Sequence, residues 1–173
     1  MYTRRGFYST AIFAIVYLVQ LMIIDQVHLP FGGFSVFLIF TLCWAALSTP
    51  EIGAIVGFFA GLFTDFAPSS NGPVGQWALI LAAIGFGIAF LRYGDDSLRS
   101  DPLSLVVFVA AAVVVAIVTY ILLNALLGID VGRVSQLART VIGNGLWSLA
   151  IAPFVLPIAS RLHRAIFETR EFQ

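Results

Sequence analysis

Charged side chains are the scarcest class in this chain of 173 residues. Asp, Glu, Lys and Arg together make up 10% of it, and hydrophobic residues make up 60%. All nine basic residues are arginines, so lysine is absent, and the mean hydropathy is +1.00. A soluble domain of this size needs far more polar surface. The composition therefore excludes a soluble globular protein and predicts an all-α integral membrane protein.

Residues that could perform catalysis or hold a metal ion are also rare. The chain has two histidines, His28 and His163, and five apolar runs separate them. Because that number is odd, the two side chains are expected on opposite sides of the bilayer, where they cannot share a metal. The lone cysteine, Cys43, has no intrachain disulfide partner and is read as a small apolar side chain. Phosphate-loop, zinc-helix and serine-elbow motifs are missing. We expect no enzyme activity, no metal, no cofactor and no nucleic-acid partner.

Long apolar runs dominate what is present. A hydrocarbon core of about 30 Å needs about 20 apolar residues in a helix, with shorter spans tolerated near turns. Breaks between runs come from polar clusters and from prolines, as in "APSSNGPVG" at 67–75. We predict a single membrane domain, residues 1–173, with six transmembrane helices at 7–24, 34–47, 52–66, 77–91, 103–127 and 141–158.

The arginines predict the orientation of these helices. With six spans, seven arginines fall on the side that holds both termini, and Arg133 and Arg139 fall on the other side. Basic residues concentrate in cytoplasmic loops. Both termini are therefore expected in the cytoplasm, and the protein is expected to be a multi-pass membrane protein.

A stripe of glycines leads to an acidic residue in the third run. Gly53, Gly57, Gly61 and Asp65 follow one another at intervals of four, so they share one face of a helix. Small residues in this pattern let two helix backbones approach closely in lipid. The partner could be another helix of this chain or the transmembrane helix of a second protein, and the spacing leaves both open.

Asp65 needs partners, because an ionised carboxylate at the edge of the hydrocarbon is costly. One candidate set is the free N–H groups at the start of the next helix, near residues 75–78; the other is Arg133 or Arg139. With the first set, Asp65 would hold the outer turn that contains Gly72, Pro73 and Gly75.

Three neutral polar side chains fall at membrane depth. Gln20, Asn124 and Asn144 lie within or at the end of apolar runs. Hydrogen bonds between helices are the ordinary use of such residues. A ligand-binding role is the alternative.

These features resemble the rod shape-determining protein MreD family. The resemblance rests on the pattern Gly-x-x-x-Gly-Leu-x-x-Asp, here Gly57 to Asp65, and on a turn Gly-Pro-x-Gly-x-x-Ala-Leu, here Gly72 to Leu79. It implies a non-enzymatic, multi-pass scaffold of the bacterial cell membrane, a subunit of the cell-elongation complex that binds MreC. Through MreC it would reach MreB, RodA and a class B penicillin-binding protein, and so influence cell shape and peptidoglycan synthesis.

A second resemblance supplies an alternative function. The MreD family is similar in fold to the substrate-binding S-components of energy-coupling factor transporters, which are six-helix proteins that take up vitamins or other small molecules. Those proteins usually carry Ala-x-x-x-Ala in the first helix for docking to the coupling subunit. Here Ala11 and Ala14 are three apart, so that docking pattern is absent.

Overall fold

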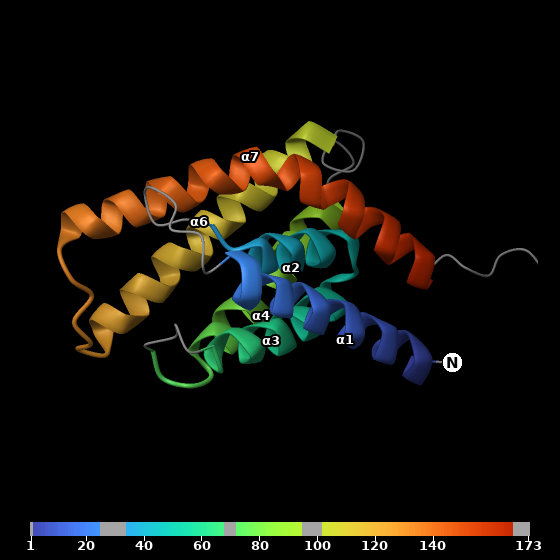
Figure 1. Cartoon of the computed structure of the whole chain (residues 1–173), viewed down its shortest axis with the longest axis horizontal. Helices are drawn as coiled ribbons and strands as arrows, with labels where there is room; N and C mark the ends of the chain where they lie inside the picture. The colour runs from blue at the N-terminus through green and yellow to red at the C-terminus, as the bar shows by residue number, and fades with distance from the viewer. Residues whose placement is uncertain (1, 25–33, 68–71, 95–101, 168–173) are drawn as a thin grey trace, which may run out of the picture.

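The structure is a computed structural model that describes residues 2–24, 34–67, 72–94 and 102–167 (Figure 1). Regular structure in these ranges is entirely helical. The elements in chain order are α1 (Tyr2–Val19), the π-helical turn η1 (Gln20–Ile24), α2 (Val36–Leu47), α3 (Pro50–Asp65), α4 (Gln76–Gly94), α6 (Pro102–Leu126) and α7 (Val134–Phe167).

Helix α2 is the centre of the bundle. It contacts α1, α3, α4, α6 and α7, and residues 37–46 are all buried. Figure 1 shows α6 and α7 running together on one side of α2, with α1 and α3 on the other. Twelve residues extend only about 18 Å. Because protein surrounds α2, its ends can be satisfied by neighbouring helices rather than exposed to lipid.

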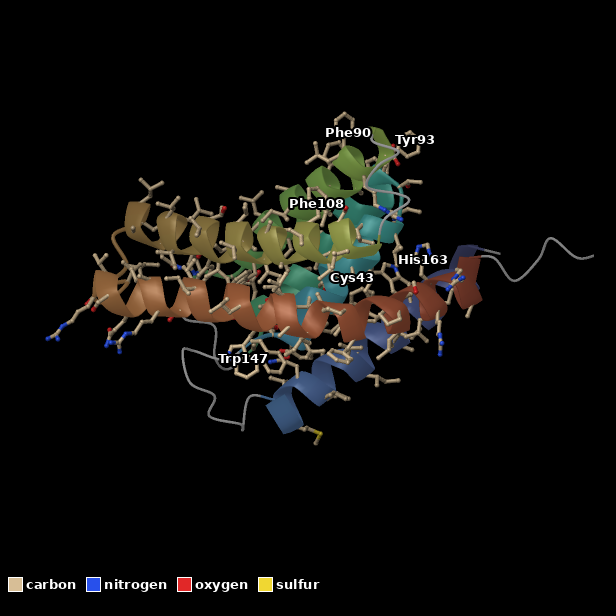
Figure 2. All side chains as sticks on the ribbon, turned by 90° about the horizontal axis from the view of Figure 1, so that it is seen from above. Cys43, Phe90, Tyr93, Phe108, Trp147 and His163 are labelled. Carbon is tan, nitrogen blue, oxygen red and sulfur yellow. The ribbon has the colours of Figure 1, made fainter. Side chains whose placement is uncertain are left out.

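Aromatic side chains attach α1 to this central helix. Phe13 of α1 makes edge-to-face contacts with Phe37, Phe40 and Trp44 of α2, at centroid distances of 6.1, 5.3 and 5.6 Å. Edge-to-face pairs of this kind add to the stabilisation from burial. Cys43, on the same helix, is buried in the interior as the apolar residue that the sequence predicts (Figure 2).

The π-helical turn at the end of α1 was not expected. Gln20 opens this turn, and its Oε1 accepts hydrogen bonds from the N–H groups of Val36 (2.8 Å) and Phe37 (3.4 Å). These are free donors at the N-terminus of α2. The side-chain oxygen of Ser35 accepts a third, from Leu38 N at 3.2 Å. The irregular turn thus delivers a buried amide oxygen to cap the central helix.

The opposite end of α2 is tied to α4 and α7. Arg92 of α4 donates a hydrogen bond to the carbonyl oxygen of Ala46. Ser48 Oγ donates to Trp44 O and lies 3.2 Å from His163 Nε2 of α7. Since the serine proton is already used, the histidine N–H is the donor in that contact. His163 also packs edge-to-face on Trp44, at 5.2 Å between centroids.

Among the described residues, three helices are long and apolar enough to cross a membrane: Gln76–Gly94, Leu103–Leu126 and Val134–Ile166. Two shorter apolar helices, Ser9–Met22 and Val36–Leu47, accompany them. Each of the six runs expected from the sequence coincides with one helix. The chain is therefore all-helical where it is described, with helices that suit a membrane protein.

Helix α7 is much longer than the run expected at 141–158. It begins at Val134, continues through Pro153 and Pro157, and ends at Phe167. Arginine interrupts an apolar run but is a good helix former, so Arg139 and Arg161 do not end the helix. Beyond residue 158, Leu162 and Ile166 still pack against the hydrophobic core.

Candidate functional site

The glycine stripe of α3 faces α4. A Cβ atom added to Gly53 would lie 2.6 Å from the carbonyl oxygen of Gly85. One added to Gly57 would overlap the carbonyl of Leu81, and one added to Gly61 would overlap the backbone of Ala78. Ordinary contacts of a Cβ atom begin at about 3.4 Å. We call this backbone-to-backbone contact the α3–α4 seam.

The seam has room for one helix, and α4 occupies it. Gly53, Gly57 and Gly61 are buried. Close van der Waals approach of this kind is a main source of helix association in lipid. Of the two uses that the spacing left open, the structure places the stripe in packing within the chain, so a second protein cannot use this face of α3.

Gly85 is the residue of the seam that sequence reasoning missed. A Cβ added to it would lie 2.5 Å from the carbonyl oxygen of Gly53. A signal was available, because α4 also carries small residues at positions 78, 82, 85 and 89. Residues with this spacing return to one helix face. A glycine stripe on one helix and a small-residue face on the next, joined by a short turn, form a recognisable pair.

Asp65 ends α3 and caps the start of α4. Its Oδ2 accepts hydrogen bonds from the N–H groups of Gly75 (3.0 Å) and Ala78 (3.1 Å), and its Oδ1 accepts from Trp77 N (3.0 Å). The side chain is 7% exposed. The N-terminus of a helix offers free donors and a positive dipole end to such a carboxylate. These contacts match the first of the two partner sets expected for Asp65.

The alternative arginine partners do not contact this carboxylate. Arg133 and Arg139 are exposed at the start of α7. No ion pair between them and Asp65 is present among the described residues. The three backbone N–H donors therefore offset the cost of burying the carboxylate.

The outer turn between α3 and α4 contains Gly72, Pro73 and Gly75, and each of them has a defined role in its geometry. Gly75 adopts φ +97°, a conformation that glycine reaches without strain. The carbonyl oxygen of Pro73 accepts a hydrogen bond from Gln76 N at 3.2 Å. Gly72 lies against two side chains, since a Cβ there would be 2.6 Å from Gln76 Oε1 and 2.8 Å from Tyr120 Oη.

The start of α4 is also tied to α6. Gln76 Nε2 donates a hydrogen bond to the carbonyl oxygen of Tyr120 at 3.1 Å. The ring of Trp77 stacks on the ring of Tyr120, with centroids 4.4 Å apart and planes 16° apart. The start of α4, which Asp65 caps, is therefore a junction of α3, α4 and α6.

This arrangement holds the end of α3 to the start of α4. Both oxygens of Asp65 accept N–H donors, one bond on Oδ1 and two on Oδ2. Within the described ranges, no three His, Cys, Asp or Glu side chains are grouped to hold a metal ion.

The three neutral polar residues at membrane depth behave differently from one another. Gln20 bonds between helices, as expected, by capping α2. Asn124 Nδ2 donates to Tyr120 O, and Asn144 Nδ2 donates to Thr140 O, each within its own helix. For the two asparagines, these bonds are not the interhelical bonds that were expected.

Comparison of the chain with protein-family models, with curated proteins and with solved structures gave no match.

Proposed function

We propose that the chain is a multi-pass scaffold protein of a bacterial cell membrane, with six crossings and both termini in the cytoplasm. The uneven arginine distribution supports this orientation. The short helices α2 and α3 are compatible with crossing because neighbouring helices cover the ends of α2, and because α4 covers one face of α3 along the seam.

We further propose that it is a non-enzymatic subunit of the cell-elongation complex, of the MreD type, which binds MreC and acts through it on MreB, RodA and a class B penicillin-binding protein. One observation carries this proposal. Gly61 and Asp65 at the end of α3 meet Gly75 and Ala78 of the following turn and helix in one junction, and Gly57 packs against Leu81 further along the same seam. The sequence pattern behind the resemblance is thus one structural unit.

The α3–α4 seam restricts where a partner helix could dock. Because α4 fills the stripe, a partner must use an outer face. Away from the seam, Phe59 of α3 is 57% exposed and Phe90 of α4 is 59% exposed. Figure 2 shows Phe90 and Tyr93 pointing away from the bundle at the end of α4. A Cβ at Gly87 would meet nothing within 4 Å, so a shallow notch lies beside the stacked rings of Phe86 and Phe90. We place the partner's transmembrane helix on this face.

Site-specific photo-crosslinking in native membranes tests this placement. A photoreactive residue at Phe59 or at Phe90 should crosslink to a single-span, coiled-coil partner that mass spectrometry identifies. The matched controls are Val107 and Val115 of α6, which are also apolar and more than half exposed. Crosslinks of equal yield from all four positions would argue against a specific docking face.

Affinity purification with mass spectrometry tests the function itself. Recovery of an MreC-like protein together with cell-wall synthases would support the scaffold. Recovery of an ATPase pair with a coupling membrane subunit would instead support the transporter alternative and refute the scaffold.

A further inference from the structure

Two adjoining cavities lie between the helices at the end of the bundle where α4 begins. One has a volume of about 320 Å³ and lies among α2, α3, α4, α6 and α7. The other has a volume of about 230 Å³ and is lined by η1, α1, α2, α3 and α7. Both are lined by Ser35, Thr64 and Asn144, so these three side chains form a common wall. The combined space is within the range of small-molecule sites.

The three shared side chains retain hydrogen-bonding capacity. Asn144 Nδ2 uses one of its two N–H groups within α7, so the amide keeps its oxygen as an acceptor and its second N–H as a donor. Thr64 Oγ1 donates its proton to Ala60 O at 3.1 Å, which leaves its lone pairs to accept. Ser35 Oγ accepts from Leu38 N, which leaves its hydroxyl proton to donate. The wall thus offers two acceptors, Asn144 Oδ1 and Thr64 Oγ1, together with hydrogen-bond donors on Ser35 and Asn144.

The remainder of the lining indicates the size and charge of an occupant. The stacked rings of Trp77 and Tyr120 form part of the larger cavity, beside Ile117 and Leu137. Neither cavity is lined by Asp, Glu, Arg, Lys or His among the described residues. A charged ligand would lose its hydration without gaining an ion pair. A flat, uncharged ring would bury its faces among aromatic and aliphatic side chains.

We propose that these cavities form a binding site for an uncharged ring compound that carries a carboxamide or lactam group. An N–H of such a ligand donates to Asn144 Oδ1, the second N–H of a carboxamide donates to Thr64 Oγ1, and the carbonyl oxygen accepts from the hydroxyl of Ser35. The ring lies against Trp77 and Tyr120. This site is separate from the outer face of α3 and α4, so it does not depend on the scaffold function.

Three isosteric probes test the chemical class directly. Benzamide is neutral, benzoate is an anion and benzamidinium is a cation, and all three have nearly the same shape. Binding is measured by saturation-transfer NMR on the full chain in lipid nanodiscs, with empty nanodiscs to correct for partition into lipid. Benzamide should bind saturably in the millimolar range expected for so small a molecule. The two ions should bind at least about tenfold more weakly.

Two substitutions test the assigned contacts. Asn144→Leu should weaken benzamide binding about tenfold, because the amide group of the ligand then lacks its acceptor. Thr64→Val, which keeps the shape and removes the hydroxyl, should weaken binding about threefold and serves as the second variant if Asn144→Leu does not fold. Ser160→Ala, on α7 but outside both cavities, should leave binding unchanged.

Several results would overturn the proposal. These are equal binding of all three probes, absence of saturable benzamide binding, and benzamide binding unaffected by the cavity substitutions. Native mass spectrometry provides one more: a phospholipid that stays bound and blocks benzamide would show that an acyl chain is the occupant.

Discussion

Gly53 of α3 and Gly85 of α4 meet backbone to backbone. A Cβ on the first would lie 2.6 Å from the carbonyl oxygen of the second, and a Cβ on the second would lie 2.5 Å from the carbonyl oxygen of the first. Since the obstructing atoms are main-chain atoms, no side chain can rotate to make room. The helices must separate to admit even a methyl group, which makes the α3–α4 seam the part of the fold most sensitive to small additions.

Gly57→Ala should destabilise the protein by about 2–3 kcal/mol, because the added methyl overlaps the carbonyl of Leu81. Gly57→Leu and Gly61→Leu should prevent assembly of the seam while membrane insertion persists. Unfolding by SDS in mixed micelles measures the loss. Gly87→Ala is the matched control, since it adds the same methyl to α4 in open space. It should be neutral or stabilising by up to about 1 kcal/mol. Equal unfolding midpoints for Gly57→Ala and Gly87→Ala would contradict the seam.

Asp65→Asn should cost about 1–2 kcal/mol, because one acceptor oxygen is replaced by a donor that faces N–H groups. Asp65→Leu should cost about 3 kcal/mol or more, since it leaves buried donors at the start of α4 without partners. Asp130→Asn tests a carboxylate whose bond to Gly132 N is exposed, and it should change stability by less than about 0.5 kcal/mol. Similar losses for Asp65→Asn and Asp65→Leu would show that the N–H contacts contribute little.

Gly75→Ala should destabilise by about 1 kcal/mol through backbone strain alone. The position has φ +97°, and a Cβ there meets nothing within 4 Å, so crowding is not involved. Gly75→Asn should cost less, because asparagine tolerates positive φ better than alanine does. Thermal unfolding in detergent compares the two. If alanine were as well tolerated as asparagine, the turn would have an alternative conformation available.

Gln20→Leu should destabilise by about 1–2 kcal/mol, because the N–H groups of Val36 and Phe37 lose a buried acceptor. Gln20→Glu retains acceptor oxygens at the helix N-terminus and should recover most of the loss. Hydrogen exchange at the first turn of α2 reports the change locally. Faster exchange there in Gln20→Leu, reversed in Gln20→Glu, is the expected pattern, and unchanged exchange in both would show that η1 does not cap α2.

The capping contact of Asp65 could be anticipated from the sequence, because its partners lie only 10–13 residues along the chain across one turn. The cap formed by Gln20 spans 16–17 residues. It depends on a π-helical turn, whereas the pattern of the run at 7–24 predicts an ordinary helix. The extent of α7 could not be anticipated from apolar runs, because arginines end a run without ending a helix.

Composition and local pattern were enough to locate the helices and to predict that some are long and apolar enough to span a membrane, because hydropathy and helix breaking are properties of neighbouring residues. Three-dimensional packing decided which helix fills the glycine stripe and which polar atoms surround the cavities. A stripe without side chains accepts any backbone that comes close, so its spacing cannot distinguish α4 from a partner. The cavities bring together Ser35, Thr64 and Asn144 from three helices, and their meeting depends on long-range contacts that no local pattern encodes.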